Sequence, residues 1–134
     1  MKIYFAGAIR SGREKVYDYA KFVECFEKNG CEVLTKHVAD PNLKVCGENL
    51  SSEKIFTRDC ELLKESDILF ADITIPSLGV GYEICEAKNL GKKVYAVYEK
   101  GKNVSGFLLG DKYIEFLEYS NCDEVLEFIE KILK

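Results

Sequence analysis

The chain has 134 residues, of which 47% are hydrophobic and 31% are charged, a composition typical of a soluble globular protein. This length allows one domain with a sizeable core, so we expect a single domain over residues 1–134. The net charge of −4 argues against a surface for nucleic acid polymers, but it does not exclude a small anion bound by a local cluster.

The sequence contains no apolar run of about 18 residues, so we expect no membrane-spanning helix and no membrane partner. The N-terminal "MKIYFAGAIR" reaches Gly7 and Arg10 too early for a signal peptide. The six cysteines form no C-x-x-C pair, and there is one histidine, so we expect no metal site. Reduced, mostly buried thiols and a cytoplasmic location follow from this pattern.

Hydrophobic periodicity predicts strands that alternate with helices. In chain order, we expect a strand at 2–6, a helix at 14–28, a strand at 31–35, a loop at 36–50, a helix within 51–67, a strand at 68–75, a helix at 81–90, strands at 93–98 and 113–119, and a helix at 122–133. Alternation of this kind favours an α/β fold, with a doubly wound, flavodoxin-like five-stranded parallel sheet and helices on both faces.

Ligands of such sheets bind beyond the carboxyl ends of the strands, where the strand order reverses. The loop "GAIRSGR" follows the first strand there, and its Gly7 and Gly12 let the backbone approach a ligand closely. Arg10 and Arg13 would add positive charge for a phosphate. Alternatively, the glycines only shape a tight turn and the arginines are solvated. The loop is neither G-x-G-x-x-G nor a Walker sequence, so we expect no cofactor.

The second loop at this edge is "TIPSLGVGYE". Pro76 restricts the preceding residue to extended geometry, and Gly79 and Gly81 permit conformations that are closed to other residues. Glu83 would then fall in the first helical turn, where the helix dipole favours its ionised form and a role as nucleophile or electrostatic stabiliser. Alternatively, Glu83 only stabilises the start of its helix.

The segments "YFAGAIRSGRE" (4–14), "LTKHV" (34–38), "DILFADITIPSLGVGYE" (67–83) and "VSGFLLG" (104–110) together resemble the 2'-deoxynucleoside 5'-phosphate N-hydrolases, relatives of the nucleoside 2-deoxyribosyltransferases. The resemblance spans nearly the whole chain, and "PSLGVGYE" is its most specific part. It implies a hydrolase that cleaves the N-glycosidic bond of a nucleotide, freeing a base and a deoxyribose 5-phosphate.

The resemblance also implies roles for three residues. Glu83 matches the nucleophile, which would form a glycosyl-enzyme ester that water resolves. Asp59 matches a second acidic residue for the leaving base or the incoming water, and Tyr4 matches a tyrosine that orients the nucleophile near the sugar. Alternatively, Asp59 is an exposed carboxylate paired with Arg58, and Tyr4 is a core aromatic residue.

The other site residues expected from the two loops and the resemblance would bind the nucleotide. They are Gly7, Ala8, Ile9, Arg10, Ser11, Gly12, Arg13, Tyr19, His37, Ser77, Gly79, Ser105, Gly106 and Phe107. His37 could instead be structural, as lone histidines at strand ends often are. The family loop often has serine and glycine where this chain has Ala8 and Ser11, which puts phosphate affinity and base preference in question.

Ser77 distinguishes between family members, because transferases that accept unphosphorylated nucleosides usually carry aspartate there. An aspartate would repel a phosphate, whereas a serine hydroxyl can donate to it, so Ser77 favours a 5'-monophosphate. The resemblance further implies a homodimer in which residues 105–107 reach the neighbouring site. Alternatively, these residues form a helix or turn within one subunit.

Two other functions stay open at this point. In a deoxyribosyltransferase, an incoming base rather than water would resolve the glycosyl-enzyme. In a non-catalytic nucleotide-binding domain, the pocket would persist without the chemistry. Base preference and the choice between ribose and deoxyribose also stay open, with Tyr4 favouring deoxyribose by resemblance.

Overall fold

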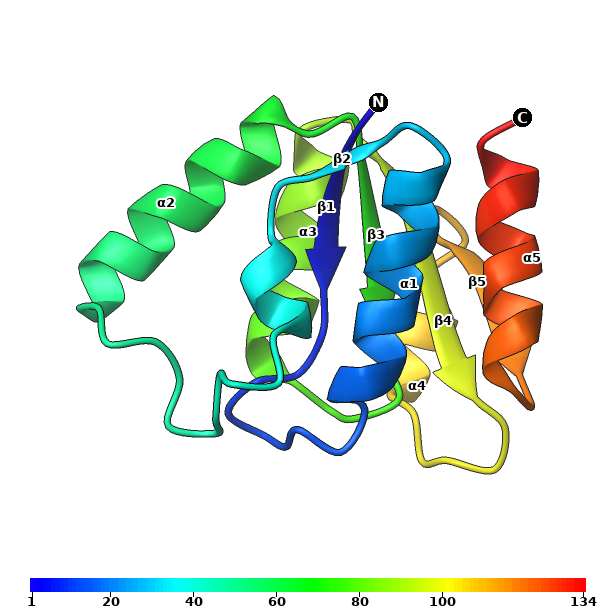
Figure 1. Ribbon diagram of the computed structural model, residues 1–134, viewed down its shortest axis with the longest axis horizontal. Helices are drawn as coiled ribbons and strands as arrows, with labels where there is room; N and C mark the ends of the chain where they lie inside the picture. The colour runs from blue at the N-terminus through cyan, green and yellow to red at the C-terminus, as the bar shows by residue number, and fades with distance from the viewer.

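A computed structural model describes residues 1–134. Its five strands are separated along the chain by helices (Figure 1). In order, the elements are β1 (Lys2–Ala6), α1 (Val16–Lys28), β2 (Glu32–Val33), the 3₁₀ helix η1 (Lys36–Ala39), α2 (Ser52–Glu65), β3 (Ile68–Asp72), α3 (Leu78–Asn89), β4 (Lys93–Glu99), α4 (Gly106–Leu109), β5 (Glu115–Tyr119) and α5 (Cys122–Ile132). No helix is long and apolar enough to cross a membrane.

The strands form one sheet in the order β2-β1-β3-β4-β5, and every neighbouring pair is parallel. This order confirms the predicted doubly wound, flavodoxin-like sheet. The chain leaves β1 for β2 on one side and reaches β3 on the other, so the order reverses beside β1. The loops after β1 and β3 therefore emerge together at the carboxyl edge of the sheet.

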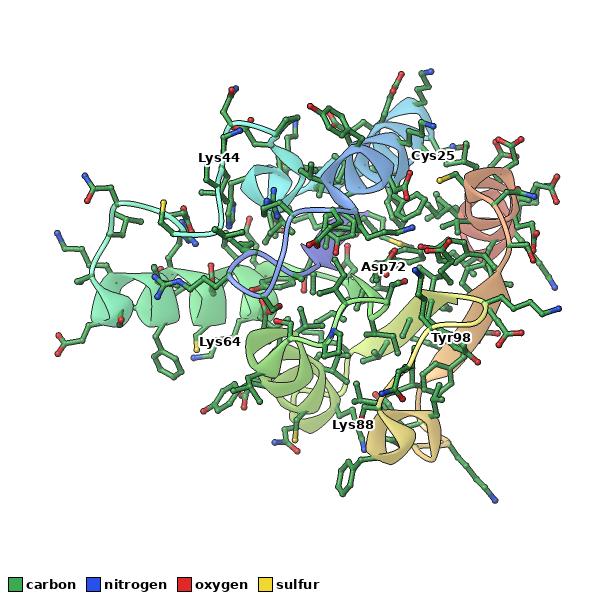
Figure 2. All side chains as sticks on the ribbon, turned by 90° about the horizontal axis from the view of Figure 1, so that it is seen from below. Cys25, Lys44, Lys64, Asp72, Lys88 and Tyr98 are labelled. Atoms are coloured by element: carbon green, nitrogen blue, oxygen red, sulfur yellow. The ribbon has the colours of Figure 1, made fainter.

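Helices cover both faces of the sheet, as predicted, because successive strand residues point to opposite sides. On one face, α1 and α5 pack on a core that includes Ile3, Phe5 and Phe70. On the other, α2, α3 and α4 pack on a core that includes Tyr4 and Leu69. Figure 2 shows this division along the strands, with α1 and α5 on one side of the sheet and α3 and α4 on the other.

Some predicted boundaries differ from the observed ones. Strand 31–35 shrinks to two residues, and the expected loop 36–50 begins with η1. Strand 68–75 ends at Asp72, whose buried carboxylate accepts hydrogen bonds from the Thr74 backbone N–H at 2.9 Å and the Tyr119 hydroxyl at 2.8 Å (Figure 2 labels Asp72). The side chain of Asp72 thereby turns the backbone out of the sheet.

The start of α3 is the most consequential difference. Helix α3 begins at Leu78 instead of residue 81, because Ser77 caps it by accepting a hydrogen bond from the Val80 backbone N–H at 3.3 Å. The prediction that Glu83 lies in the first helical turn is therefore wrong, since Glu83 is the sixth residue of the helix. Gly79 and Gly81 are also helical and have no positive φ, so their predicted special backbone conformations are wrong too.

The cysteines are less buried than predicted. All six are free thiols, but only Cys25 is buried, and Cys46 and Cys85 are exposed. Four of the six lie on helices, and their exposure differs from one helix position to another.

Arg13 joins the first loop to the segment after β2. Its guanidinium donates to four backbone carbonyls, those of Ala8 at 2.8 Å, Val38 at 2.8 Å, Leu43 at 2.9 Å and Asp40 at 3.0 Å. A planar fork of N–H groups can satisfy acceptors in several directions at once. Arg13 therefore holds two loops together, and its predicted role in phosphate binding does not fit this arrangement.

We expect Arg13→Lys to destabilise the protein, because an ammonium group cannot reach four carbonyls that diverge around a guanidinium. The expected loss is about 2 to 4 kcal/mol in the free energy of unfolding, measured by urea denaturation. Arg10→Lys is the matched control, because Arg10 lies in the same loop and is exposed. Equal stability of the two variants would contradict this role of Arg13.

Candidate active site

A cavity of about 900 Å³ opens beside β1 at the carboxyl edge of the sheet. Its walls come from the loop after β1, from residues 37–38 and 47–48, from one side of α2 and from α3 as far as Glu86. The cavity thus lies at the reversal of strand order, where ligands of doubly wound sheets bind.

Ten of the predicted site residues line this cavity. They are Tyr4, Gly7, Ile9, Arg10, Ser11, His37, Asp59, Ser77, Gly79 and Glu83. The structure thus brings together all three predicted catalytic side chains, which lie on β1, α2 and α3.

Four predicted binding residues do not line the cavity, and they belong to the first loop or lie beneath it. Ala8 and Tyr19 are fully buried, and the Tyr19 hydroxyl accepts a hydrogen bond from the Ala8 backbone N–H at 3.2 Å. A Cβ atom on Gly7 would stand 2.8 Å from the Tyr19 ring. Ala8, Gly12, Arg13 and Tyr19 do not line the cavity, so their predicted role as direct ligands does not fit this arrangement.

The segment Ser105–Phe107 lies outside the cavity of its own chain. Ser105 caps the short helix α4, accepting from the Leu108 backbone N–H at 3.4 Å, and the Phe107 side chain is 94% exposed. These residues therefore do not line the site formed by a single chain.

Glu83 reaches inward from α3 to the buried Tyr4, whose hydroxyl donates a hydrogen bond to Glu83 Oε2. Burial raises the pKa of Glu83 to about 7, and the charge of Asp59 adds to this, while the Tyr4 hydrogen bond and Arg58 oppose it. The prediction that the helix dipole keeps Glu83 ionised is therefore wrong, because the residue lies past the first turn, where that effect fades.

Tyr4 remains a hydrogen-bond donor throughout the physiological range. Burial and the neighbouring Glu83 raise the pKa of its hydroxyl well above the ordinary value, because a buried phenolate beside a carboxylate is strongly disfavoured. Tyr4 thus has both the core position and the contact with Glu83 that were considered as alternatives.

The second acidic group, Asp59, belongs to a charged cluster at the opposite wall. Asp59 Oδ1 accepts from Arg58 Nε at 2.9 Å, and Arg58 also donates to both carboxylate oxygens of Glu48, at 2.6 and 2.7 Å. The cation lowers the pKa of Glu48. Arg58 Nη2 lies 3.3 Å from Nε2 of His37, the pKa of which is lowered chiefly by burial.

The pair of Arg58 with Asp59, considered as an alternative, is observed, but the contact of Arg58 with Glu48 was not predicted from the sequence. Glu48 and Arg58 are drawn together only by the path of residues 40–51, which we call the strap and which contains no helix or strand. Gly47 of the strap has φ of 81°, and a Cβ there would stand 2.9 Å from Arg10 Nε. No periodic pattern marks these positions, although the glycine before Glu48 was a turn signal.

One wall of the cavity is apolar. It includes Ile55, Phe56, Leu63, Leu78, Val80 and Tyr82. The rings of Phe56 and Tyr82 meet edge to face with centroids 6.4 Å apart, an arrangement that leaves flat aromatic surface at the rim. This wall suits a planar, partly apolar group.

The end of the cavity at α3 suits an anion. Ser77 and Gly79 lie at the start of this helix, where backbone N–H groups lack helical partners. The Ser77 oxygen accepts from the Val80 N–H, so its own hydrogen is free to donate to a ligand. Arg10 and Ser11, from the loop after β1, line the same cavity.

Comparison with known proteins agrees with this geometry. Residues 3–125 match the family model described as nucleoside 2-deoxyribosyltransferase. A Methanosarcina barkeri protein, provisionally named 2'-deoxynucleoside 5'-phosphate N-hydrolase 1, is 42% identical over 110 residues, which are 82% of this chain and 69% of that protein. The 5-hydroxymethyl-dUMP N-hydrolase of Esox lucius is 41% identical over 115 residues, 82% of this chain and 79% of its own length.

Among solved structures, the CMP N-glycosidase of Clostridium botulinum has the same fold, with a TM-score of 0.75 at 20% identity over 98% of this chain and 99% of that one. The fold, the arrangement of the cavity and the match over residues 3–125 lead to one conclusion: the chain belongs to the nucleoside 2-deoxyribosyltransferase family.

Proposed function

We propose that the protein is a hydrolase that cleaves the N-glycosidic bond of (2'-deoxy)nucleoside 5'-monophosphates to a free base and (deoxy)ribose 5-phosphate. The observation that carries this proposal is the hydrogen-bonded Tyr4–Glu83 pair, which lines the same cavity as Asp59. The cavity volume of about 900 Å³ falls in the range of about 300–1,000 Å³ that is typical of small-molecule sites. Relatives above 40% identity carry names of this activity.

In this mechanism, Glu83 acts as the nucleophile. Its ionised carboxylate attacks the anomeric carbon while the bond from that carbon to the base nitrogen breaks, and the base leaves with the bonding electron pair. The product is a glycosyl ester of Glu83, which a water molecule hydrolyses to sugar phosphate and free carboxylate. Asp59 assists proton transfer to the leaving base or from the incoming water, and Tyr4 holds the attacking carboxylate in place.

The substrate spans the cavity between its two chemically different ends. The phosphate lies at the start of α3, with Ser77, Ser11 and Arg10 as donors, and the base lies along the apolar wall of α2 and α3. Between them, the sugar carbon meets Glu83. A neutral Ser77 favours a phosphate because an aspartate there would repel it.

A transferase is the second candidate, because the matching family model carries that description. In a transferase, a base would displace Glu83 from the sugar. Incubating a deoxynucleoside with a second free base distinguishes the two, since base exchange without a phosphate requirement would replace the hydrolase proposal.

We also propose that the protein works as a homodimer in which Ser105, Gly106 and Phe107 complete the neighbouring site. Two large apolar side chains near the cavity mouth and on α4 support this, Leu78 at 97% and Phe107 at 94% exposure. Closed two-fold dimers are also the commonest oligomers.

A panel of ribo- and deoxyribonucleosides and their 5'-monophosphates, assayed for free base by chromatography, tests the reaction. We expect turnover of monophosphates, and we expect Ser77→Asp to raise their KM about tenfold or more while nucleosides change little, because the new charge faces the phosphate. Ser77→Asn is the control, because asparagine has the shape of aspartate without its charge. Equal losses for both substrate classes would place Ser77 away from the phosphate.

Glu83→Gln should abolish turnover and yet stabilise the protein at high pH. The pKa of Glu83 is about 7 in the folded protein, against an ordinary value of 4.5. The folded state therefore loses about 3 kcal/mol of stability relative to the unfolded state as the pH rises from below 4.5 to above 7. Glutamine does not ionise, so the melting temperature of the variant should exceed that of the wild type at pH 8 but not at pH 4. Retained activity would show that Glu83 is not the nucleophile.

The pH dependence of kcat/KM should follow the ionisation of Glu83. We expect the rate to rise with pH, with a midpoint near 7, and then to level off, because only the carboxylate attacks. Tyr4→Phe removes a hydrogen bond that lowers the pKa of Glu83, so the midpoint should move to higher pH. The phosphate of the substrate titrates equally with both enzymes, so their difference isolates Glu83, and an unchanged midpoint would contradict this assignment.

A further inference from the structure

We infer that Arg58 is a positioning residue that holds the His37 ring neutral, with its proton on Nδ1, and fixes the carboxylate of Asp59 at the cavity wall. Its effect on turnover rests on the proposed function, whereas the state of the histidine is a property of the free protein.

The guanidinium of Arg58 is fixed by three partners from different parts of the chain. Nη1 and Nη2 donate to the two oxygens of Glu48 on the strap, at 2.6 and 2.7 Å. Nε donates to Asp59 at 2.9 Å, and Nη2 lies 3.3 Å from Nε2 of His37 on η1. A two-bond contact with a carboxylate restricts the whole plane of the group. Arg58 is thereby held in one orientation between α2, the strap and η1.

This orientation determines the state of the histidine. An arginine N–H can only donate, so Nε2 of His37 must accept, and a neutral ring that accepts at Nε2 carries its proton on Nδ1. A protonated ring would place a second cation against Arg58. Glu48 Oε1, at 3.6 Å from Nε2, is too distant for a hydrogen bond from a protonated ring.

All the charged groups near the ring act on its protonation. Glu48 and Asp59 favour the protonated form, whereas burial, Arg58 and Arg13 oppose it, and the net effect is a lowered pKa. Removing Arg58 would leave two carboxylates beside the ring without their shared cation, so His37 would then gain a proton more easily.

The same contact orients the second acidic group. Asp59 Oδ1 is engaged by Arg58 Nε, so Oδ2 is the oxygen left for the leaving base or the incoming water. A lysine keeps the charge but cannot bind Glu48 by two bonds and Asp59 at the same time. Arg58 therefore acts through its shape as well as its charge.

The single histidine of the chain makes this inference directly measurable. In the wild-type protein labelled with ¹⁵N-histidine, NMR should show a neutral ring with the proton on Nδ1 and a titration midpoint below the ordinary value of about 6.5. In Arg58→Met, the midpoint should rise above that of the wild type, because the cation is lost while burial of the ring persists. A wild-type ring that is protonated on Nε2 or titrates above about 6.5 overturns the inference, even if the variant does not fold.

Glu65→Gln is the matched control. Glu65 lies on α2 like Arg58, and the substitution breaks its exposed ion pair with Lys2, so the histidine titration should not change. With substrate, Arg58→Met should lower kcat about tenfold or more with little change in KM. Arg58→Lys should keep the ring neutral without restoring kcat, and full recovery by lysine would refute the positioning role. If the proposed function is wrong, the wild type shows no turnover while the histidine titration still decides this inference.

Discussion

The site depends on one hydrogen bond, from the hydroxyl of Tyr4 to the carboxylate of Glu83. It joins strand β1 to helix α3 in a place where burial would otherwise favour the protonated acid. The donor is fully buried in the core between the sheet and α3, so its position is set by the packing of the fold. A carboxylate with a pKa near the ambient pH combines a sizeable ionised fraction with greater basicity than an exposed glutamate has.

The two acidic groups of the cavity have different surroundings. Glu83 has a neutral donor and an apolar environment, whereas Asp59 contacts the permanent cation of Arg58. Environments that differ in this way give two carboxyl groups separate tasks within one site. The division arises from topology, because Glu83 comes from the helix packed on the sheet and Asp59 from the helix that borders the strap.

Much of this could be predicted from the sequence, since periodicity placed β1 at residues 2–6 and predicted the order of the five strands and four longer helices, although not the short helices η1 and α4. The family motifs indicated Tyr4, Asp59 and Glu83, which the fold brings to one cavity. The start of α3 could not be predicted from Gly79 and Gly81, because glycine suggests a turn unless the capping role of Ser77 is recognised.

The Glu48–Arg58 pair was beyond sequence reasoning for a different reason. Its two residues lie ten positions apart on a strap and a helix, and their meeting depends on a backbone path that no periodic pattern encodes. For Tyr19, by contrast, the sequence predicted a ligand contact that the structure does not show. Tyr19 lies under the first loop, where its hydroxyl supports the backbone that a ligand would touch.

Strand β2 is short, so the segment that follows it can change in length during evolution. Only two residues of the chain between α1 and α2 belong to the sheet, and the strap that follows is held by side chains such as Arg13 and Arg58. Insertions or deletions in the strap would leave the sheet ladder intact, since surface connections tolerate changes of length. One wall of the cavity can therefore be remodelled during evolution independently of the wall that carries Glu83.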